Sequence, residues 1–190
     1  MRPAHRLRQI LARFRDTEAG VAAVEFALIL PIMLLIYIGS VEASALISVD
    51  RKVQNVSGAV GDLVARAKEN LTLTELQDYV RVAGGIMAPY EPAPLQQIVT
   101  QVSVDEDGVA TVVWSRGYEH ENPKQSIAHG QGDEYPLPEA ITAIAKEQFV
   151  IVAEASYKYR PLFGIVIDQD IQLYRENFYL PRFGGQIALN

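Results

Sequence analysis

The sequence of 190 residues contains no cysteine, only one tryptophan and only three histidines. Without cysteine, disulfide bonds, thiolate metal sites and cysteine nucleophiles are excluded. A glycine-rich phosphate loop, a His-Glu-x-x-His pair and a nucleophile elbow are also missing, and these motifs mark many catalytic sites. We therefore expect no catalytic residue, no cofactor and no metal ion, and we predict that the protein is not an enzyme.

Basic residues are scarce outside the first twenty positions. Residues 1–20 carry a net charge of +3, whereas the rest of the chain carries −9. An acidic body argues against nucleic acid as a partner, because binding to phosphates needs clustered Lys and Arg. A short basic segment before an apolar run is instead typical of a cytoplasmic leader that orients a membrane protein.

The apolar run covers residues 21–41 and contains a single charged residue, Glu25. A helix over this range is about 32 Å long, close to the thickness of the bilayer hydrocarbon. The pattern predicts one transmembrane helix, with residues 42–190 forming a domain outside the cytoplasm. A lone carboxylate costs roughly 2.5–3.5 kcal/mol at the bilayer centre and less near its edge, so Glu25 needs a partner or a function. An α-amine at residue 21 would be such a partner, but it exists only if the chain is cut before Val21.

Two other interpretations of this segment remain open. In the first, the chain is an unprocessed membrane anchor that holds its outer domain near a larger secretion complex. Alternatively, Ala43 and Ala45 offer a small-x-small cleavage site, and cutting there would release a periplasmic enzyme or binding protein. That cut would create a signal peptide well above the usual length of about 15–30 residues.

The residues around this segment form a recognisable motif. A basic head ends at Gly20, a glutamate follows at Glu25, an aromatic residue at Phe26 and an early proline at Pro31. This motif resembles the N-terminal segment of the TadE-like family, which are pseudopilins or minor pilins of the bacterial tight-adherence (Flp) pilus system. The resemblance implies cleavage by a prepilin peptidase between Gly20 and Val21.

The same resemblance implies how such a protein is assembled. Glu25, next to Phe26, would neutralise the new amine of Val21 on a neighbouring subunit. The partners would be other pilins or pseudopilins, the inner-membrane assembly platform and the lipid bilayer. The location would be the bacterial inner membrane, with the N-terminus cytoplasmic and the domain periplasmic or incorporated into a pilus.

An apolar stripe follows the membrane segment and predicts a helical stalk over residues 42–68. Its residues recur in alternating steps of three and four, which is a helical seam; they are Leu46, Val49, Val53, Val56, Val60 and Leu63. We consider two interpretations of this stripe, which are compatible with each other. It packs on the protein's own sheet, or it contacts the helix of another pseudopilin.

The remaining sequence predicts an α+β domain of pilin-like architecture. Thr72 and Glu75 have the spacing of a capping box at the start of a helix over 72–85. Alternating or β-rich patterns predict strands over 97–104, 109–115, 148–160 and 170–180. We expect an antiparallel sheet of about four strands, on which the long N-terminal helix packs.

Two groups of polar residues are candidates for metal sites. His120 and His129 lie among acidic residues in a polar loop, and Asp105 begins an acidic hairpin tip with carboxylates of the kind that bind calcium. Neither group has a recognised ligand spacing. The ordinary interpretation is a solvated loop and a charged turn, with Trp114 in the core.

Overall fold

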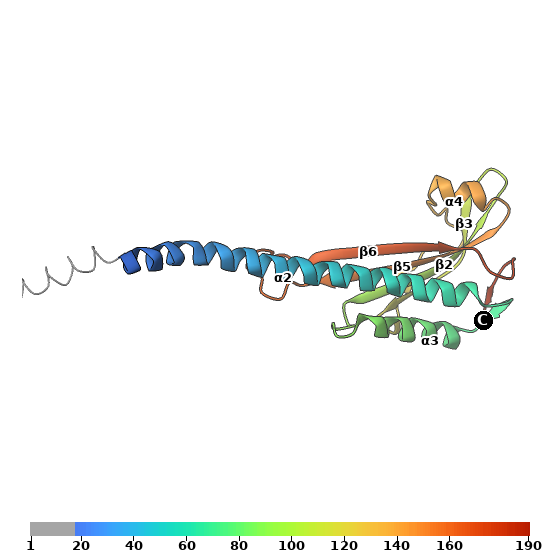
Figure 1. Ribbon diagram of the computed structural model, residues 1–190. Coiled ribbons are helices and arrows are strands. Elements are labelled where there is room, and N and C mark those ends of the chain that lie inside the picture. Colours follow the sequence, from blue (N-terminus) through green and yellow to red (C-terminus); the bar gives the residue numbers. More distant parts are fainter. Residues whose placement is uncertain (1–17) are drawn as a thin grey trace, which may run out of the picture. The chain divides into compact units, whose positions relative to one another are not determined.

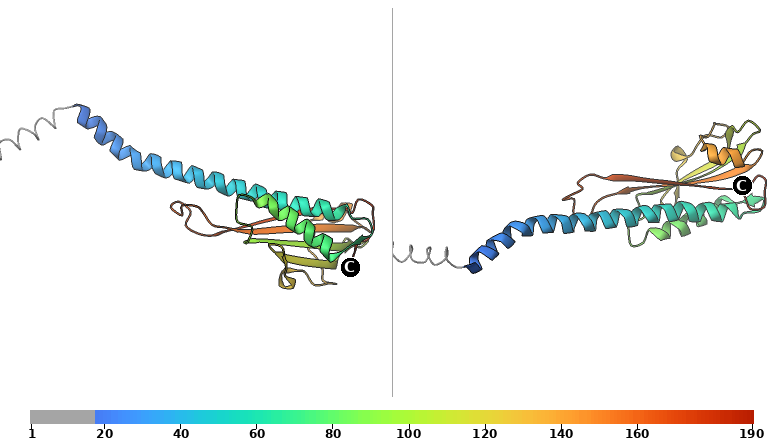
Figure 2. Two further views of the ribbon diagram at one scale, coloured as in Figure 1. Left: turned by 90° about the horizontal axis from the view of Figure 1, so that it is seen from below. Right: turned by 45° about the horizontal axis from the view of Figure 1, so that its top comes forward.

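A single helix, α2, forms the first part of the structure (Figure 1). The computed structural model describes residues 18–190, so the basic arginines of the predicted leader lie outside the described residues. Helix α2 spans Glu18–Ala65 and contains Pro31 in its interior. Proline lacks an N–H and its ring disturbs the preceding turn, so a bend is expected near it. Figure 2 shows that α2 indeed curves in its blue N-terminal part.

The chain divides into two compact units, and the division falls inside α2. The first unit consists of the N-terminal part of α2, up to Ser44, and a loop from a distant part of the sequence, Leu162–Asp168. The second unit consists of Ala45–Pro161 and Gln169–Asn190. Helix α2 therefore belongs partly to each unit.

The second unit is built on an antiparallel sheet with the strand order β4-β3-β2-β5-β6. Its four long strands are β2 (Leu95–Val104), β3 (Ala110–Glu119), β5 (Phe149–Tyr159) and β6 (Ile171–Tyr179). A separate parallel pair joins β1 (Asn70–Leu71) to β7 (Ala188–Leu189). The remaining helices are α3 (Leu73–Gly84), η1 (Gly85–Met87), η2 (Gln125–Ile127) and α4 (Glu139–Ile144).

The sheet has five strands instead of the four expected from the sequence. Strand β3 continues past Ser115 because Gly117 and Tyr118 find partners on β2, although the sequence there resembles a polar loop. The chain then turns back, and the two-residue strand β4 (Asn122–Pro123) pairs with the end of β3. Pairing with β2 thus overrides the weak local preference of this segment for a strand.

Two separate apolar clusters of buried side chains cover the two faces of the sheet. On one face α2 and α3 pack against residues such as Val99, Ile151 and Ala153. On the other face Val150 and Val152 are buried together with partly buried Ile141 of α4. The alternation predicted for β5 is therefore present, but both sets of side chains are buried over part of the strand.

The first core contains Trp114, the only tryptophan of the chain. Its ring N–H donates to Gln101 Oε1 at 3.0 Å and to the carbonyl of Ile187 at 2.8 Å. Helix α3 begins at the expected capping box, where the hydroxyl of Thr72 accepts from the N–H of Glu75 and the carboxylate of Glu75 accepts from the N–H of Thr72. Two of the orphan N–H groups at this helix start are thereby satisfied.

Candidate functional site

The predicted cleavage point lies within the first turns of α2. Gly20 and Val21 are both helical, and the side chain of Val21 is exposed. A peptidase binds an extended backbone, so the predicted cut between Gly20 and Val21 requires this turn to unwind first. Glycine in a helix is about 1 kcal/mol less favourable than alanine, which makes unwinding at Gly20 easier.

Glu25 lies one helical turn after Val21, on the same side of the helix. Its side chain is exposed, and it has no ion-pair or hydrogen-bond partner within residues 18–190. Phe26 beside it is also exposed. A terminal amine at Val21 would lie about 6 Å along the helix axis from Glu25 of the same chain. The carboxylate is thus available to a cation from its own or another helix.

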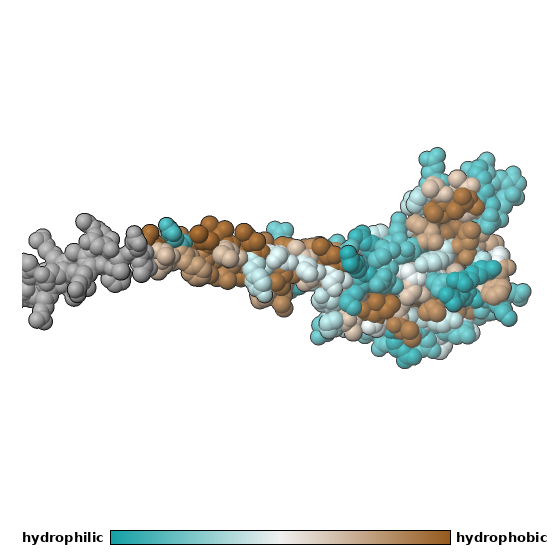
Figure 3. Space-filling view, in the orientation of Figure 1, coloured by the Kyte–Doolittle hydropathy of each residue, from teal (hydrophilic) through white to brown (hydrophobic). Residues whose placement is uncertain are grey.

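The helix around Glu25 exposes apolar side chains on every side. Every residue from 21 to 37 is exposed, and Leu28 is 70% exposed. Figure 3 shows these apolar side chains covering the visible face of the helix. Among the described residues this is the one helix that is long and apolar enough to cross a membrane. Exposure on this scale in water would be unfavourable, whereas lipid accepts it.

A second carboxylate, Glu42, ends this apolar segment and was not singled out from the sequence. It is only 1% exposed. The N–H of Gly164 donates to Glu42 Oε1 at 2.8 Å, and the N–H of Ile167 donates to Oε2 at 3.2 Å. We refer to residues 162–168 as the Glu42-binding loop. The available signal in the sequence was a lone acidic residue directly after the apolar run.

These contacts set the charge state of Glu42. Burial raises the pKa of its carboxyl group, but hydrogen bonds from the backbone N–H groups of the loop, first those of Ile167 and Gly164, together lower the pKa below 4.5. The ionised form is therefore favoured by the folded loop. A group with a lowered folded pKa stabilises the fold above its unfolded pKa, and this contribution is lost as pH falls through the folded value.

We accordingly expect the Glu42-binding loop to loosen under acid. A nitroxide on Leu162→Cys, the only thiol in a chain without cysteine, should become more mobile as the pH falls through the lowered pKa of Glu42. The same label in a Glu42→Gln background should be mobile already at neutral pH and should not respond to acid. Asp62 also has a lowered pKa, because of its hydrogen bond with Arg66, but it belongs to the second unit. Equal pH responses in both backgrounds would contradict this role of Glu42.

The apolar stripe of α2 is largely occupied by the protein's own core. Val49, Val53, Val56 and Val60 are 0% exposed and pack in the first core cluster. Leu46 is partly buried against the same cluster, and Leu63 is also half-buried. The structure thus shows these four valines packed in the protein's own core, and contact of the stripe with the helix of another pseudopilin remains a prediction. The exposed side of this helix segment instead includes Ile47, Arg51 and Asn55.

Strand β6 holds the same helix segment through polar contacts. Asn177 accepts from Gln54 Nε2 at 2.9 Å and donates to Ser57 Oγ at 2.6 Å. The hydroxyl of Tyr179 donates to the carbonyl of Gly58 at 3.0 Å. A Cβ on Gly61 would lie 2.6 Å from a ring carbon of Tyr179, so this glycine makes room for the ring.

His129 takes part in a hydrogen-bonded cluster with Glu154 and Tyr174. Among residues 18–190, no group of three His, Asp or Glu side chains is placed to hold a metal ion. His129 Nε2 lies 2.7 Å from the largely buried carboxylate of Glu154, and the hydroxyl of Tyr174 donates to the same carboxylate at 2.8 Å. Burial and this hydrogen bond raise the pKa of Tyr174, so the hydroxyl stays protonated as a donor. The cluster satisfies a buried charge within the sheet.

The acidic residue Asp105 at the hairpin tip stabilises the β2–β3 turn. The carboxylate of Asp105 accepts from the N–H of Val109 at 2.8 Å, and the backbone groups of the same two residues are also bonded. Gly108 adopts a φ of +91°, which side-chain-bearing residues rarely adopt. The side chain of Asp105 thus closes the β2–β3 turn.

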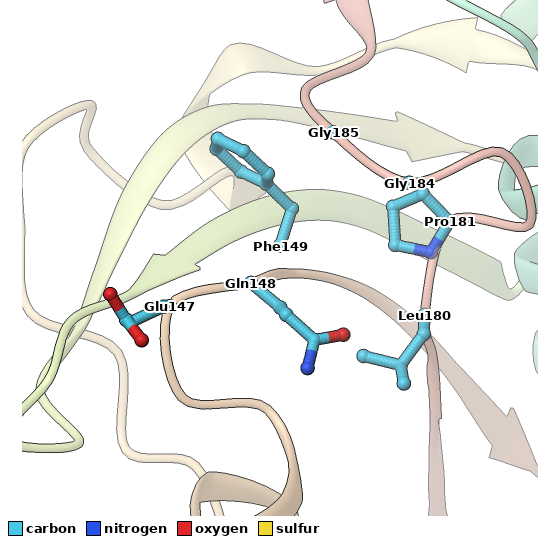
Figure 4. A pocket seen from close by; sticks show the side chains of 7 residues that line it. All are labelled: Glu147, Gln148, Phe149, Leu180, Pro181, Gly184 and Gly185. Atoms are coloured by element: carbon cyan, nitrogen blue, oxygen red, sulfur yellow. The ribbon is translucent and has the colours of Figure 1, made fainter.

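A small surface pocket lies between the start of β5 and the chain after β6 (Figure 4). It is lined by Glu147, Gln148, Phe149, Leu180, Pro181, Gly184 and Gly185. Glu147 is the only ionisable residue of the lining, and in Figure 4 its carboxylate lies away from Leu180 and Pro181. A single carboxylate does not make an acid–base pair or a nucleophile with its base.

The similarity of this chain to known proteins was found in helix α2 and not in the sheet. Residues 20–61 match a family model described as TadE-like protein. No curated protein and no solved structure matches the chain. The family match confirms the resemblance found in the sequence, and it includes Gly20, Glu25, Glu42 and the four buried valines. It suggests involvement in the Tad (Flp) pilus system, whose TadE-like proteins are structural and pilus-associated.

Proposed function

We propose that this chain, whose residues 20–61 form a TadE-like segment, is a minor pilin or pseudopilin of the Flp pilus system. The observation that carries the proposal is the start of α2. There Gly20, Glu25 and Pro31 occupy their motif positions on a helix that exposes apolar side chains on all sides. The same helix also contributes side chains to the core of the sheet domain. A subunit that connects a membrane to a surface assembly requires such a helix.

Processing is the first step of the proposed function. The chain enters the inner membrane with its basic leader in the cytoplasm and its sheet domain in the periplasm. A prepilin peptidase then cuts between Gly20 and Val21 after the first turn of α2 has unwound. The cut removes the basic leader and creates a positive amine on Val21.

Assembly is the second step. Glu25 has no partner within the described residues, and in lipid an unpaired carboxylate is unfavourable. The amine of Val21 on a neighbouring subunit supplies the opposite charge, and attraction between two charges is much stronger in lipid than in water. The helices are thus drawn together at a fixed height in the bilayer, while the exposed side of α2 around Ile47 and Arg51 remains free for contacts.

The unbroken helix disfavours release of a soluble periplasmic protein. Ala43 and Ala45 lie well inside α2, next to the buried Glu42. A cut after Ala45 would divide the helix and remove Glu42 from the loop that binds it. No such loss accompanies a cut before Val21, which lies in the first turns.

The mature N-terminus tests the proposed function directly. We expect intact mass and N-terminal sequencing of the protein from its native membrane to show a chain that begins at Val21. A Gly20→Arg variant should retain the leader, whereas Ala19→Ser, the neighbouring change, should be processed. A chain that begins at Met1 in cells with an active prepilin peptidase would favour the unprocessed scaffold. A chain that begins after Ala45 would exclude both membrane roles.

A further inference from the structure

The Glu42-binding loop carries an unusual number of exposed apolar side chains. Leu162 is 76% exposed, and Phe163, Ile165 and Val166 are each more than half exposed. A surface loop is normally polar, so a compact apolar group of this kind marks a contact with a partner or a membrane. Charged residues bound the group in the sequence, Arg160 on one side and Asp168 on the other.

The loop is attached to the apolar helix and to no other element of its unit. Besides the two hydrogen bonds to Glu42, Val166 packs at Gly39, where a Cβ would lie 3.5 Å from one of its methyl carbons. The loop is therefore held at the level of Gly39–Glu42, where the apolar segment ends.

This level coincides with the outer boundary of the bilayer. With Val21 at the inner boundary, helical rise places Gly39 about 27 Å away and Glu42 about 32 Å away. These heights lie on either side of the roughly 30 Å hydrocarbon thickness. The apolar side chains of the loop thus lie where acyl chains meet headgroups.

Glu42 supplies hydrogen-bond acceptors for backbone N–H groups of a loop at the bilayer boundary. Backbone N–H groups without partners are excluded from lipid, because no water is present to bond them. The carboxylate of Glu42 accepts from the N–H groups of Gly164 and Ile167, and is itself almost completely buried. Two of the loop's backbone N–H groups therefore face the helix, while its apolar side chains are exposed.

We propose that the Glu42-binding loop inserts Leu162, Phe163, Ile165 and Val166 into the outer leaflet beside α2. The protein then contacts the bilayer through two elements, the transmembrane helix and this loop, and its partner at the loop is lipid. The inference rests on the proposed membrane span, but not on cleavage at Gly20. Release of the subunit into a pilus would have to withdraw the loop as well as the helix.

The test uses the absence of native cysteine. Full-length protein with a single cysteine at Phe163, labelled with a small fluorophore, is reconstituted in phosphatidylcholine vesicles. Matched labels are placed at Leu28 in the apolar helix and at Val82 on α3, both strongly exposed. Brominated acyl chains and aqueous iodide serve as the two quenchers. We expect the label at Phe163 to be quenched by brominated lipid nearly as strongly as that at Leu28, and to be shielded from iodide, unlike that at Val82.

Each other result overturns the inference in a distinguishable way. If iodide quenches the label at Phe163 while brominated lipid quenches the label at Leu28, the membrane span stands and the loop insertion is refuted. Shielding from both quenchers would identify a contact with another protein chain instead of lipid. Failure of Leu28 to reach lipid would refute the membrane span and the proposed function with it.

A second variant tests the part played by Glu42. In Glu42→Gln the charge is lost and only one side-chain oxygen remains for the two backbone N–H groups. The label at Phe163 should then lose most of its quenching by lipid, while that at Leu28 keeps it. Unchanged quenching at Phe163 would show that Glu42 does not hold the loop at the bilayer.

Discussion

Glu25→Ala is expected to weaken association of the mature helix with its neighbours while leaving membrane insertion intact. Removal of the carboxylate leaves the amine of Val21 on a neighbouring subunit without its counter-ion in lipid. An unpaired charge costs roughly 2.5–3.5 kcal/mol at the centre of the bilayer and less near the inner boundary, where Val21 lies. Each 1.4 kcal/mol is a factor of ten, so association should fall by about ten- to a hundredfold. Insertion itself should improve slightly, because Glu25 no longer opposes it.

Cross-linking in native membranes measures this effect. A cysteine at Ile47, on the exposed side of α2, reports contacts with neighbouring subunits without touching the core. Leu28→Ala is the matched control, since it changes an exposed apolar residue of the same helix and should preserve cross-linking. The N-terminus of each variant should be determined as well, so that a loss of processing is not mistaken for a loss of pairing. Unchanged cross-linking and unchanged pilus assembly in Glu25→Ala would refute the role given to Glu25.

Gly61→Ala is expected to destabilise the sheet domain by about 2 kcal/mol, because overpacking a tight contact costs typically 1–3 kcal/mol. The added Cβ would lie 2.6 Å from the ring of Tyr179 and 3.0 Å from the Cβ of Ala153. Neither atom retreats easily, since the hydroxyl of Tyr179 is bonded to Gly58 and Ala153 lies in β5, which has strands on both sides. The usual gain of helix propensity from alanine is therefore exceeded by the clash.

Thermal unfolding of the full chain in detergent, followed by the fluorescence of Trp114, measures this change. A loss of about 2 kcal/mol should lower the midpoint by roughly 4–8 °C in a protein of this size. Gly85→Ala is the control, because its backbone is helical and nothing lies within 4 Å of the added Cβ. Equal midpoints for the two variants would show that Tyr179 does not pack against Gly61 as described.

The local features of the fold were accessible to sequence reasoning. The capping box at Thr72, the hairpin turn after Asp105 and the alternation in β5 each involve residues close together in the chain. The stripe of α2 also predicted a buried helix face, but not which surface would bury it. Its four valines pack in the protein's own core, while the side of the helix with Ile47 is exposed.

The sequence by itself thus determined the membrane-length helix, the motif around Gly20 and Glu25, and the α+β pattern, since periodicity and charge act over a few turns or strands. Tertiary structure alone decided the fifth strand, the room that Gly61 makes for Tyr179, and the partner of Glu42. The residues that meet at Glu42 are as far as 125 positions apart. Such long-range contacts produce no periodic pattern in the sequence, because they depend on which distant segments the fold brings together. For that reason the loop at Glu42 was found only in the structure.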